Sequence, residues 1–433
     1  MRRLGALAGL LLVALVVAIP TVYSVLSFPK SLRLLPGQTT RFYLGAGLRL
    51  RDDTDPEAVS AAAGGGVAIH AGGVGQERLR LTILGVTLRR ATLAVVPEVE
   101  VIPGGQSVGV LVSRRGLLVV RTTGVEGPDG PVPSPAEAAG IRPGDVVVAV
   151  GPQLIHHPVQ LQQLVQAYGA ADEAVPLVLD RAGARLDLQV RPVLGRQQPV
   201  DRRREPGYVL GLVLEDPAAG VGTLTFWDPK SGVYGALGHP ITSHQGGDVL
   251  RVEDGRIVNA QIRGISPGQR GKPGEKLGVF DAGGGELGSI SQNSDLGIFG
   301  QLYLPPPPGL FGRPLPVALA DQVKVGPATM LTVLNHDQVE AFDVMIEAVM
   351  PQKRPQVKGL VIRVVDPRLL AETGGIVQGM SGSPLIQDGR FVGAVTHVFV
   401  NDPTHGFGVL AEWMLDQSGL WAGADVVSRP SAA

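Results

Sequence analysis

The most informative part of the sequence is Gly379-Met380-Ser381-Gly382-Ser383-Pro384-Leu385-Ile386, continued by Gln387-Asp388-Gly389-Arg390-Phe391-Val392-Gly393-Ala394-Val395. It places a serine between glycines, followed by an apolar strand, a tight turn and a second strand. Glycine tolerates backbone conformations that other residues avoid, so this loop can project a hydroxyl and converge backbone N–H groups. The pattern indicates a nucleophilic serine beside an oxyanion hole, with Gly379 and Ser381 as the expected N–H donors.

The same motif distinguishes between two serines. Ser381 is the serine of a Gly-x-Ser sequence that begins at Gly379. Ser383, in contrast, is followed directly by Pro384. Ser381 is therefore the predicted nucleophile. An α/β-hydrolase would carry Gly-x-Ser-x-Gly within a βαβ alternation, which does not surround Ser381. We expect a chymotrypsin-like serine peptidase domain of the double β-barrel type instead.

Composition supports a mainly β protein. The chain has 433 residues, with Gly 60, Pro 35 and only 4% aromatic residues, which favours short strands and many turns. The net charge of −1 argues against bulk attraction to nucleic acid. Cysteine is absent from the sequence, which excludes disulfides, thiolate catalysis and cysteine zinc sites. The sequence shows no cluster of metal ligands, and we expect no metal or other cofactor.

The N-terminus predicts contact with a membrane. Arg2 and Arg3 precede an apolar run from Leu4 to about Phe28. A run of about 20 apolar residues spans a bilayer, and the arginines would keep the preceding end cytoplasmic. We expect residues 1–28 to be an uncleaved transmembrane anchor, with the remainder outside the cytoplasm. A cleaved signal peptide is the alternative.

Three further segments precede the peptidase. Residues 29–100 alternate apolar and polar positions, and we expect a small β-rich domain there. Residues 101–195 resemble a PDZ domain: the stretch 134–145 leads into an apolar strand, and a helical pattern follows. A PDZ domain binds a peptide C-terminus as an added strand, and Val108, Gly109 and Val110 are the candidate carboxylate-binding loop. Residues 196–207 form a charged linker, and residues 208–433 are the predicted peptidase domain.

His239 is the predicted general base. It ends an apolar strand and is surrounded by small residues, which would fix its backbone and leave the imidazole accessible. His244 is close in sequence and is the rival base. His397 and His405 follow the nucleophile and could flank the substrate groove, but core or loop roles are favoured for both.

The acid of the triad has three candidates on the sequence alone. Asp366 ends a strand just before the serine loop, and Pro367 prevents simple continuation of that strand. Asp295 lies between His239 and Ser381, where a chymotrypsin-like chain order expects the acid. Asp281 is a weaker third candidate.

Several long motifs resemble the stage IV sporulation protein B peptidase family of endospore-forming bacteria. They are the stretches 375–384, 393–404, 222–226 and 236–239. The order of anchor, β-rich segment, PDZ domain and serine peptidase is also similar, so the resemblance covers nearly the whole chain. It implies a triad of Ser381, His239 and Asp366. Pro240 departs from the family pattern, which usually has a small residue after the histidine.

The resemblance also implies a biological role. A family member is secreted across the forespore inner membrane, cleaves itself between anchor and PDZ domain, and is released into the intermembrane space. There it cuts a regulator of an intramembrane metalloprotease, which then processes a mother-cell sigma factor precursor. The expected partners are protein substrates, the protein itself included, and the membrane. The alternatives are a non-catalytic PDZ scaffold and a general envelope chaperone-protease.

Overall fold

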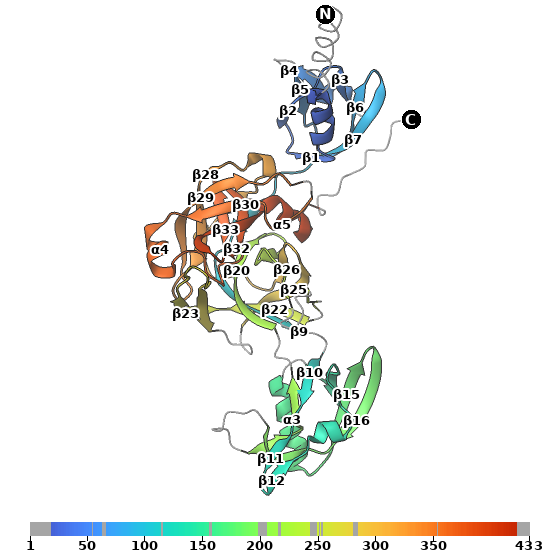
Figure 1. Ribbon diagram of the computed structural model, residues 1–433, viewed down its shortest axis with the longest axis vertical. Helices are drawn as coiled ribbons and strands as arrows, with labels where there is room; N and C mark the ends of the chain where they lie inside the picture. Colours follow the sequence, from blue (N-terminus) through green and yellow to red (C-terminus); the bar gives the residue numbers. More distant parts are fainter. Residues whose placement is uncertain are drawn as a thin grey trace, which may run out of the picture.

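The computed structural model shows three units arranged along the longest axis of the molecule (Figure 1). A small β domain lies at one end, two β-barrels lie in the middle, and a second small domain lies at the other end. The structure describes residues 19–53, 55–62, 66–113, 116–155, 158–197, 206–214, 218–242, 249–250, 252, 254–279, 285–352 and 354–421.

The predicted anchor lies mostly outside the described residues. Residues 19–27 of it are helical. In the described part of the chain, no helix is both long enough and apolar enough to cross a membrane.

The N-terminal domain consists of two sheets around one apolar core. The first sheet has the order β1-β7-β6-β3 and the second the order β2-β5-β4. In β6, Leu79 and Leu81 are fully buried while the arginines beside them face outward, as the alternating pattern predicts. The elements are β1 (Ser31–Leu34), β2 (Thr39–Tyr43), β3 (Leu48–Asp52), η1 (Pro56–Ala58), β4 (Val59–Ala62), β5 (Gly66–His70), β6 (Gly75–Ile83) and β7 (Val86–Val95).

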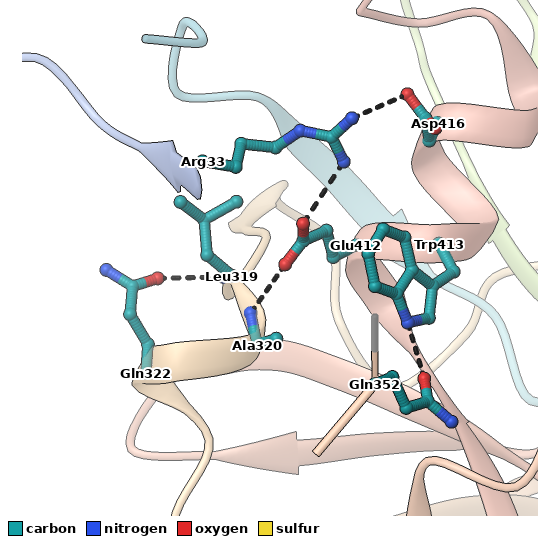
Figure 2. A network of polar contacts seen from close by, with 8 residues as sticks. All are labelled: Arg33, Leu319, Ala320, Gln322, Gln352, Glu412, Trp413 and Asp416. Carbon is teal, nitrogen blue, oxygen red and sulfur yellow. Dashed lines mark hydrogen bonds and ion pairs between the residues drawn. The ribbon is translucent and has the colours of Figure 1, made fainter. Parts of the chain in front are cut away.

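Arg33 of β1 connects this domain to helix α5 (Ala411–Ser418) (Figure 2). Its guanidinium contacts Glu412 at 3.1 Å and Asp416 at 3.0 Å. It also lies 4.5 Å from the ring centroid of Trp421. The other oxygen of Glu412 accepts a hydrogen bond from the Ala320 N–H at 2.7 Å. The buried carboxylate of Glu412 is therefore fully engaged at this domain junction.

Six strands close the first barrel. Each strand pairs with the next in the ring β9-β20-β21-β26-β25-β22, and β22 pairs with β9 to complete it. The short strands β8 and β27 extend the sheet beyond β20. The elements are β8 (Glu100–Pro103), β9 (Ser107–Ser113), β20 (Ala218–Trp227), β21 (Val233–Ala236), β22 (Asp254–Asn259), β25 (Glu286–Ser294), β26 (Gly297–Leu302) and β27 (Leu315–Pro316).

The second barrel is formed by six further strands in the closed order β28-β29-β30-β33-β32-β31. The turn between β31 and β32 has Asp388 and Gly389 at positive φ, as the predicted tight turn requires. The prediction of a mainly β, double-barrel fold is confirmed. A separate two-stranded sheet consists of β23 (Gln261–Ser266) and β24 (Glu275–Val279). The elements of the second barrel and its flanking helices are η2 (Ala320–Gln322), β28 (Gly326–Val333), β29 (Val339–Val349), β30 (Leu360–Val364), α4 (Pro367–Thr373), β31 (Pro384–Gln387), β32 (Arg390–Phe399), β33 (Asp402–Leu410) and α5 (Ala411–Ser418).

The remaining domain is inserted between two neighbouring strands of the first barrel. The chain leaves at the end of β9 and returns at the start of β20, and these strands pair antiparallel from Ala218↔Val112 to Thr223↔Ser107. The predicted boundary at residue 101 is therefore displaced, because β9 belongs to the barrel. Its elements are β10 (Leu117–Thr122), β11 (Val125–Gly127), β12 (Gly130–Val132), α2 (Pro135–Ala138), β13 (Val146–Val150), β14 (Gln153–Leu154), α3 (Pro158–Ala170), β15 (Val175–Arg181), β16 (Ala184–Val190), β17 (Val193–Gln197), β18 (Gly207–Val209) and β19 (Leu212–Leu214).

Polar contacts shape the helix and turn of the inserted domain as its sequence suggests. The Ser134 hydroxyl accepts a hydrogen bond from the Glu137 N–H and so caps α2. Asp145 is buried and accepts from the Arg181 guanidinium at 2.6 Å, which lowers the pKa of its carboxyl. In α3, Leu161 and Val165 are buried in the domain core.

Candidate active site

Ser381 and His239 line one cleft between the two barrels. The cleft has a volume of about 580 Å³. The first barrel contributes residues of β9 and β20 and the segment around His239. The second barrel contributes the Ser381 loop and residues of β32. Ser381 lies between the third and fourth strands of its barrel, and His239 follows the third strand of the other. The topology therefore brings together two residues that are 142 positions apart in the sequence (381 − 239).

The loop around Ser381 depends on glycines that have positive φ and pack closely against neighbouring atoms. Gly379 and Gly382 both have φ of +91°. A Cβ at Gly382 would lie 2.3 Å from the carbonyl oxygen of Thr223, so only glycine fits there. Thr223 holds the loop from barrel 1: its hydroxyl donates to the Gly379 carbonyl at 2.8 Å, and its N–H donates to the Ser381 carbonyl at 3.1 Å.

These contacts engage carbonyl groups and leave two N–H groups available. Among the residues that the structure describes, the N–H groups of Gly379 and Ser381 donate to no acceptor. Ser383 is fully buried and its hydroxyl bonds to Thr332, whereas Ser381 borders the cleft. The arrangement suits a developing oxyanion in front of Ser381.

The His239 side chain is held in one tautomer by its own loop. Its Nδ1 lies 2.9 Å from the carbonyl oxygen of Pro240, so Nδ1 carries the proton and donates. Burial lowers the pKa of His239 from its ordinary value of 6.5. The imidazole is therefore neutral at pH 7, with a lone pair on Nε2. This is the protonation state of a general base.

Asn293 holds the backbone that follows His239. Its side-chain oxygen accepts from the Ile241 N–H at 2.9 Å, and its amide donates to the carbonyls of Ile241 and Leu250. Sequence reasoning did not find Asn293, because its partners are more than 40 positions away. Its effect is to anchor the His239 loop to β25.

The Ser381 hydroxyl forms a hydrogen bond with a backbone carbonyl and not with the His239 imidazole. It donates to the carbonyl oxygen of Thr396 in β32 at 3.0 Å. Rotation about the Cβ–Oγ bond of Ser381 directs the hydroxyl proton elsewhere in the cleft.

The structure does not bring Asp366 to His239, which corrects the predicted triad. Asp366 is the N-cap of α4: one oxygen accepts from the Leu369 N–H at 2.9 Å, and the other lies 3.4 Å from the Asp343 N–H. Asp366 does not line the cleft, and the acceptor at Nδ1 of His239 is a backbone carbonyl. A capping role explains an aspartate directly before Pro367.

Comparison with known families identifies both the barrels and the inserted domain. The model of the SpoIVB peptidase S55 family matches residues 206–415, and a PDZ-domain model matches residues 130–181. Residues 206–415 are therefore similar to the SpoIVB S55 peptidases. No curated protein sequence matches the chain at a significant level.

Solved structures show a weaker likeness. The Rv3671c protease from M. tuberculosis in its active form is 18% identical, over 49% of this chain and 77% of that one, with a TM-score of 0.28. Its inactive form is 18% identical, over 46% of this chain and 84% of that one, with a TM-score of 0.27. TM-scores of this size do not establish a shared architecture.

The cleft that contains Ser381 and His239 holds a second histidine. The ring centroids of His239 and His397 lie 5.2 Å apart. Burial and the neighbouring His239 lower the pKa of His397. The expected core or loop role is therefore wrong for His397, which lines the cleft. His405 contacts Glu347 and Asp402 and does not line it.

Asp295 is exposed in the turn between β25 and β26. This turn adjoins the His239 loop, because a Cβ at Gly297 would lie 2.9 Å from the Gly238 nitrogen. The other two candidates of the sequence analysis, His244 and Asp281, lie outside the described residues.

The predicted carboxylate-binding loop of the PDZ domain belongs to the peptidase instead. Val108, Gly109 and Val110 are in β9, where they pair with β20 and β22, and Val110 lines the catalytic cleft. A better match is 210–212, since Gly211 has φ of +72° and leads into β19, the last strand of its sheet in the described part of the chain. The apolar-Gly-apolar pattern was the signal that could have found it.

Proposed function

We propose that this protein is a serine endopeptidase in which Ser381 is the nucleophile and His239 the general base. The observation that carries the proposal is their position in one cleft, beside two N–H groups that donate to no acceptor among the described residues. Neither residue alone would support it, because buried histidines and glycine-flanked serines both occur as structural features. Similarity to the S55 peptidase family supports the reaction class.

The reaction follows from the groups present. The Ser381 hydroxyl turns from the Thr396 carbonyl, gives its proton to Nε2 of His239, and its oxygen attacks the scissile carbonyl carbon. The N–H groups of Gly379 and Ser381 stabilise the negative oxygen that forms. His239 then returns the proton to the leaving amine, and water repeats the sequence on the acyl-enzyme. The Pro240 carbonyl keeps Nδ1–H oriented throughout.

The proposed biological role follows the family. We propose that the protein is anchored by its N-terminal segment, acts outside the cytoplasm and cleaves itself between that segment and the PDZ domain. Its further substrate is a regulator of an intramembrane metalloprotease in sporulation signalling. The match to the SpoIVB family supports this role, and the PDZ domain offers β19 as a strand for recognition of a peptide C-terminus.

The test is expression of the full chain as wild type, Ser381→Ala and His239→Gln. We expect the wild type to shorten over time, N-terminal sequencing to locate the cut before the PDZ domain, and both variants to stay intact. A fluorophosphonate probe is expected to label the wild type at Ser381 only. Shortening of Ser381→Ala at the wild-type rate would exclude self-cleavage by this serine, and probe attachment elsewhere would exclude it as the nucleophile.

A further inference from the structure

Lys276 is a buried lysine that the proposed reaction does not use. It lies in β24 and is 5% exposed. Its nitrogen donates to the Thr332 hydroxyl at 2.7 Å, and among the described residues it forms no ion pair. A buried amine without a carboxylate partner is unfavourable in its charged form, and burial lowers the pKa of Lys276 to about 7. A hydrophobic residue would fill this space without that penalty.

The position of Lys276 relates it to the oxyanion loop in two ways. First, its backbone N–H donates to the Gln378 carbonyl at 2.9 Å. Its side-chain stem lies directly beneath Gly379, where an added Cβ would come within 3.1 to 3.3 Å of three of its carbon atoms. The stem therefore forms the floor under the residue that supplies one of the two oxyanion N–H groups.

Second, the amine reaches the other end of the same loop through a shared hydroxyl. Thr332 in β28 bonds both to Lys276 Nζ and, at 3.0 Å, to the Ser383 hydroxyl. Thr332 and Ser383 are fully buried. Ser383 is two residues beyond Ser381, and its N–H bonds to the Met380 carbonyl. The chain of contacts from Lys276 thus spans the loop from Gly379 to Ser383.

We propose that Lys276 is a positioning residue of the oxyanion hole: its stem supports Gly379, and its amine, through Thr332, holds Ser383. Together these contacts set the relative positions of the Gly379 and Ser381 N–H groups. The inference rests on the proposed function, because it concerns the same hole. Hydrogen-bond donors act on a transition state only when they are held in place, so a small displacement lowers kcat more than it weakens substrate binding.

Three variants of the full chain test this role. Lys276→Met keeps the stem and removes the amine, while Thr332 and Ser383 can still bond to each other. Thr332→Val removes the hydroxyl that bonds to both the Lys276 amine and the Ser383 hydroxyl. The double variant tests whether Lys276 and Thr332 act through the same chain of contacts. Lys324→Met is the control, because Lys324 is an exposed lysine whose amine pairs with the exposed Asp388.

The measurement is hydrolysis of p-nitrophenyl acetate, expressed per active site titrated with a fluorophosphonate, with Ser381→Ala as background. We expect kcat of Lys276→Met to fall about 10- to 100-fold while KM stays nearly unchanged. Thr332→Val should fall similarly, and the double variant should be no worse than the more severe single one. The control should match the wild type.

The outcomes separate the two proposals. If the wild type is no more active than Ser381→Ala, the proposed function fails and this inference fails with it. If the wild type is active but Lys276→Met has wild-type kcat per titrated site, only the positioning role fails. The same holds if Lys276→Met merely lowers the titratable fraction, because that result indicates a role in folding alone. Additive effects of the two substitutions would also overturn the shared path through Thr332.

Discussion

The imidazole rings of His239 and His397 lie 5.2 Å apart in the cleft that also contains Ser381. The two rings approach from different barrels, since His239 follows β21 and His397 is in β32. At this distance a positive charge on one ring disfavours a charge on the other. Burial lowers the pKa of His397, and the repulsion lowers it further.

Activity should persist at pH values below the ordinary imidazole pKa. Burial lowers the pKa of His239 from 6.5, so the imidazole stays neutral as the pH falls through that value. The neutral base, and with it the activity, is lost only when the pH falls below the lowered pKa. His397→Gln should move this acidic limb little, because burial lowers the pKa of His239 whereas the repulsion between the rings lowers the pKa of His397. The limb is measured as kcat/KM against pH. His405→Gln, outside the cleft, is the control and should leave the limb in place.

Asp366→Asn should retain most activity. Asparagine is also a good N-cap, so α4 keeps its first hydrogen bond. Asp366→Ala should lower the free energy of unfolding by about 1 kcal/mol through loss of that cap. Asp295→Asn is compared at the same time in a peptide-hydrolysis assay. A large loss of kcat in Asp366→Asn, with stability unchanged, would show that the carboxylate acts on His239 after all.

The stability of the peptidase domain should rise with pH because of Lys276. Burial lowers its pKa from 10.5 to about 7, so between these values the unfolded chain binds a proton that the folded chain does not. The free energy of unfolding then rises with pH by up to about 1.4 kcal/mol per unit, and the gain is lost as the pH falls toward 7.

Urea unfolding of the wild type and Lys276→Met between pH 7 and 10 measures this effect. Tryptophan fluorescence reports the right domain, because all three tryptophans, Trp227, Trp413 and Trp421, lie within or directly beside the barrels. Parallel pH dependence of the two proteins would contradict a buried lysine that releases its proton on folding.

Gly382→Ala should lower activity strongly, whereas Gly389→Ala should leave it nearly unchanged. Both glycines have positive φ, so each alanine should lower stability by about 1 kcal/mol. Only Gly382 faces a close obstacle, the Thr223 carbonyl oxygen at 2.3 Å from the added Cβ, while nothing lies within 4 Å at Gly389. Displacing the loop should lower kcat by about 100-fold. Equal activities in the two variants would show that the loop tolerates displacement.

Arg33→Met should destabilise the contact between the N-terminal domain and α5. It leaves the buried Glu412 carboxylate without its guanidinium, which should lower the free energy of unfolding by about 3 kcal/mol. Adding Glu412→Gln should restore part of this loss, because no buried charge then remains unpaired. Arg185→Met removes an exposed pair with Asp187 and should change stability little. Calorimetry of the four proteins tests the coupling.

Local patterns were sufficient to predict the nucleophile loop. The glycines around Ser381, the tight turn at Asp388-Gly389 and the flanking strands are encoded within about 20 consecutive residues, and short-range geometry requires these residue types. The S55 family, the PDZ helix and turn, and the placement of His239 at a strand end were also readable from the sequence.

Two predictions failed because one local pattern fits two structures. The apolar alternation of Val108 to Val112 suits a strand of either domain, and its partners 218–223 are more than 100 residues away. Aspartate before proline at a strand end suits a catalytic acid or an N-cap equally, and only the contacts of Asp366 with Leu369 and Asp343 distinguish them.

Residue types and short spacings were therefore sufficient to predict the mainly β class, the family resemblance, and Ser381 and His239 as candidate site residues. The tertiary structure alone decided that the PDZ domain is inserted between β9 and β20. It also decided that His397 enters the cleft and that Lys276 lies buried beneath Gly379. These features depend on which distant strands pair, and barrel closure brings residues together whose separation along the chain carries no local signal.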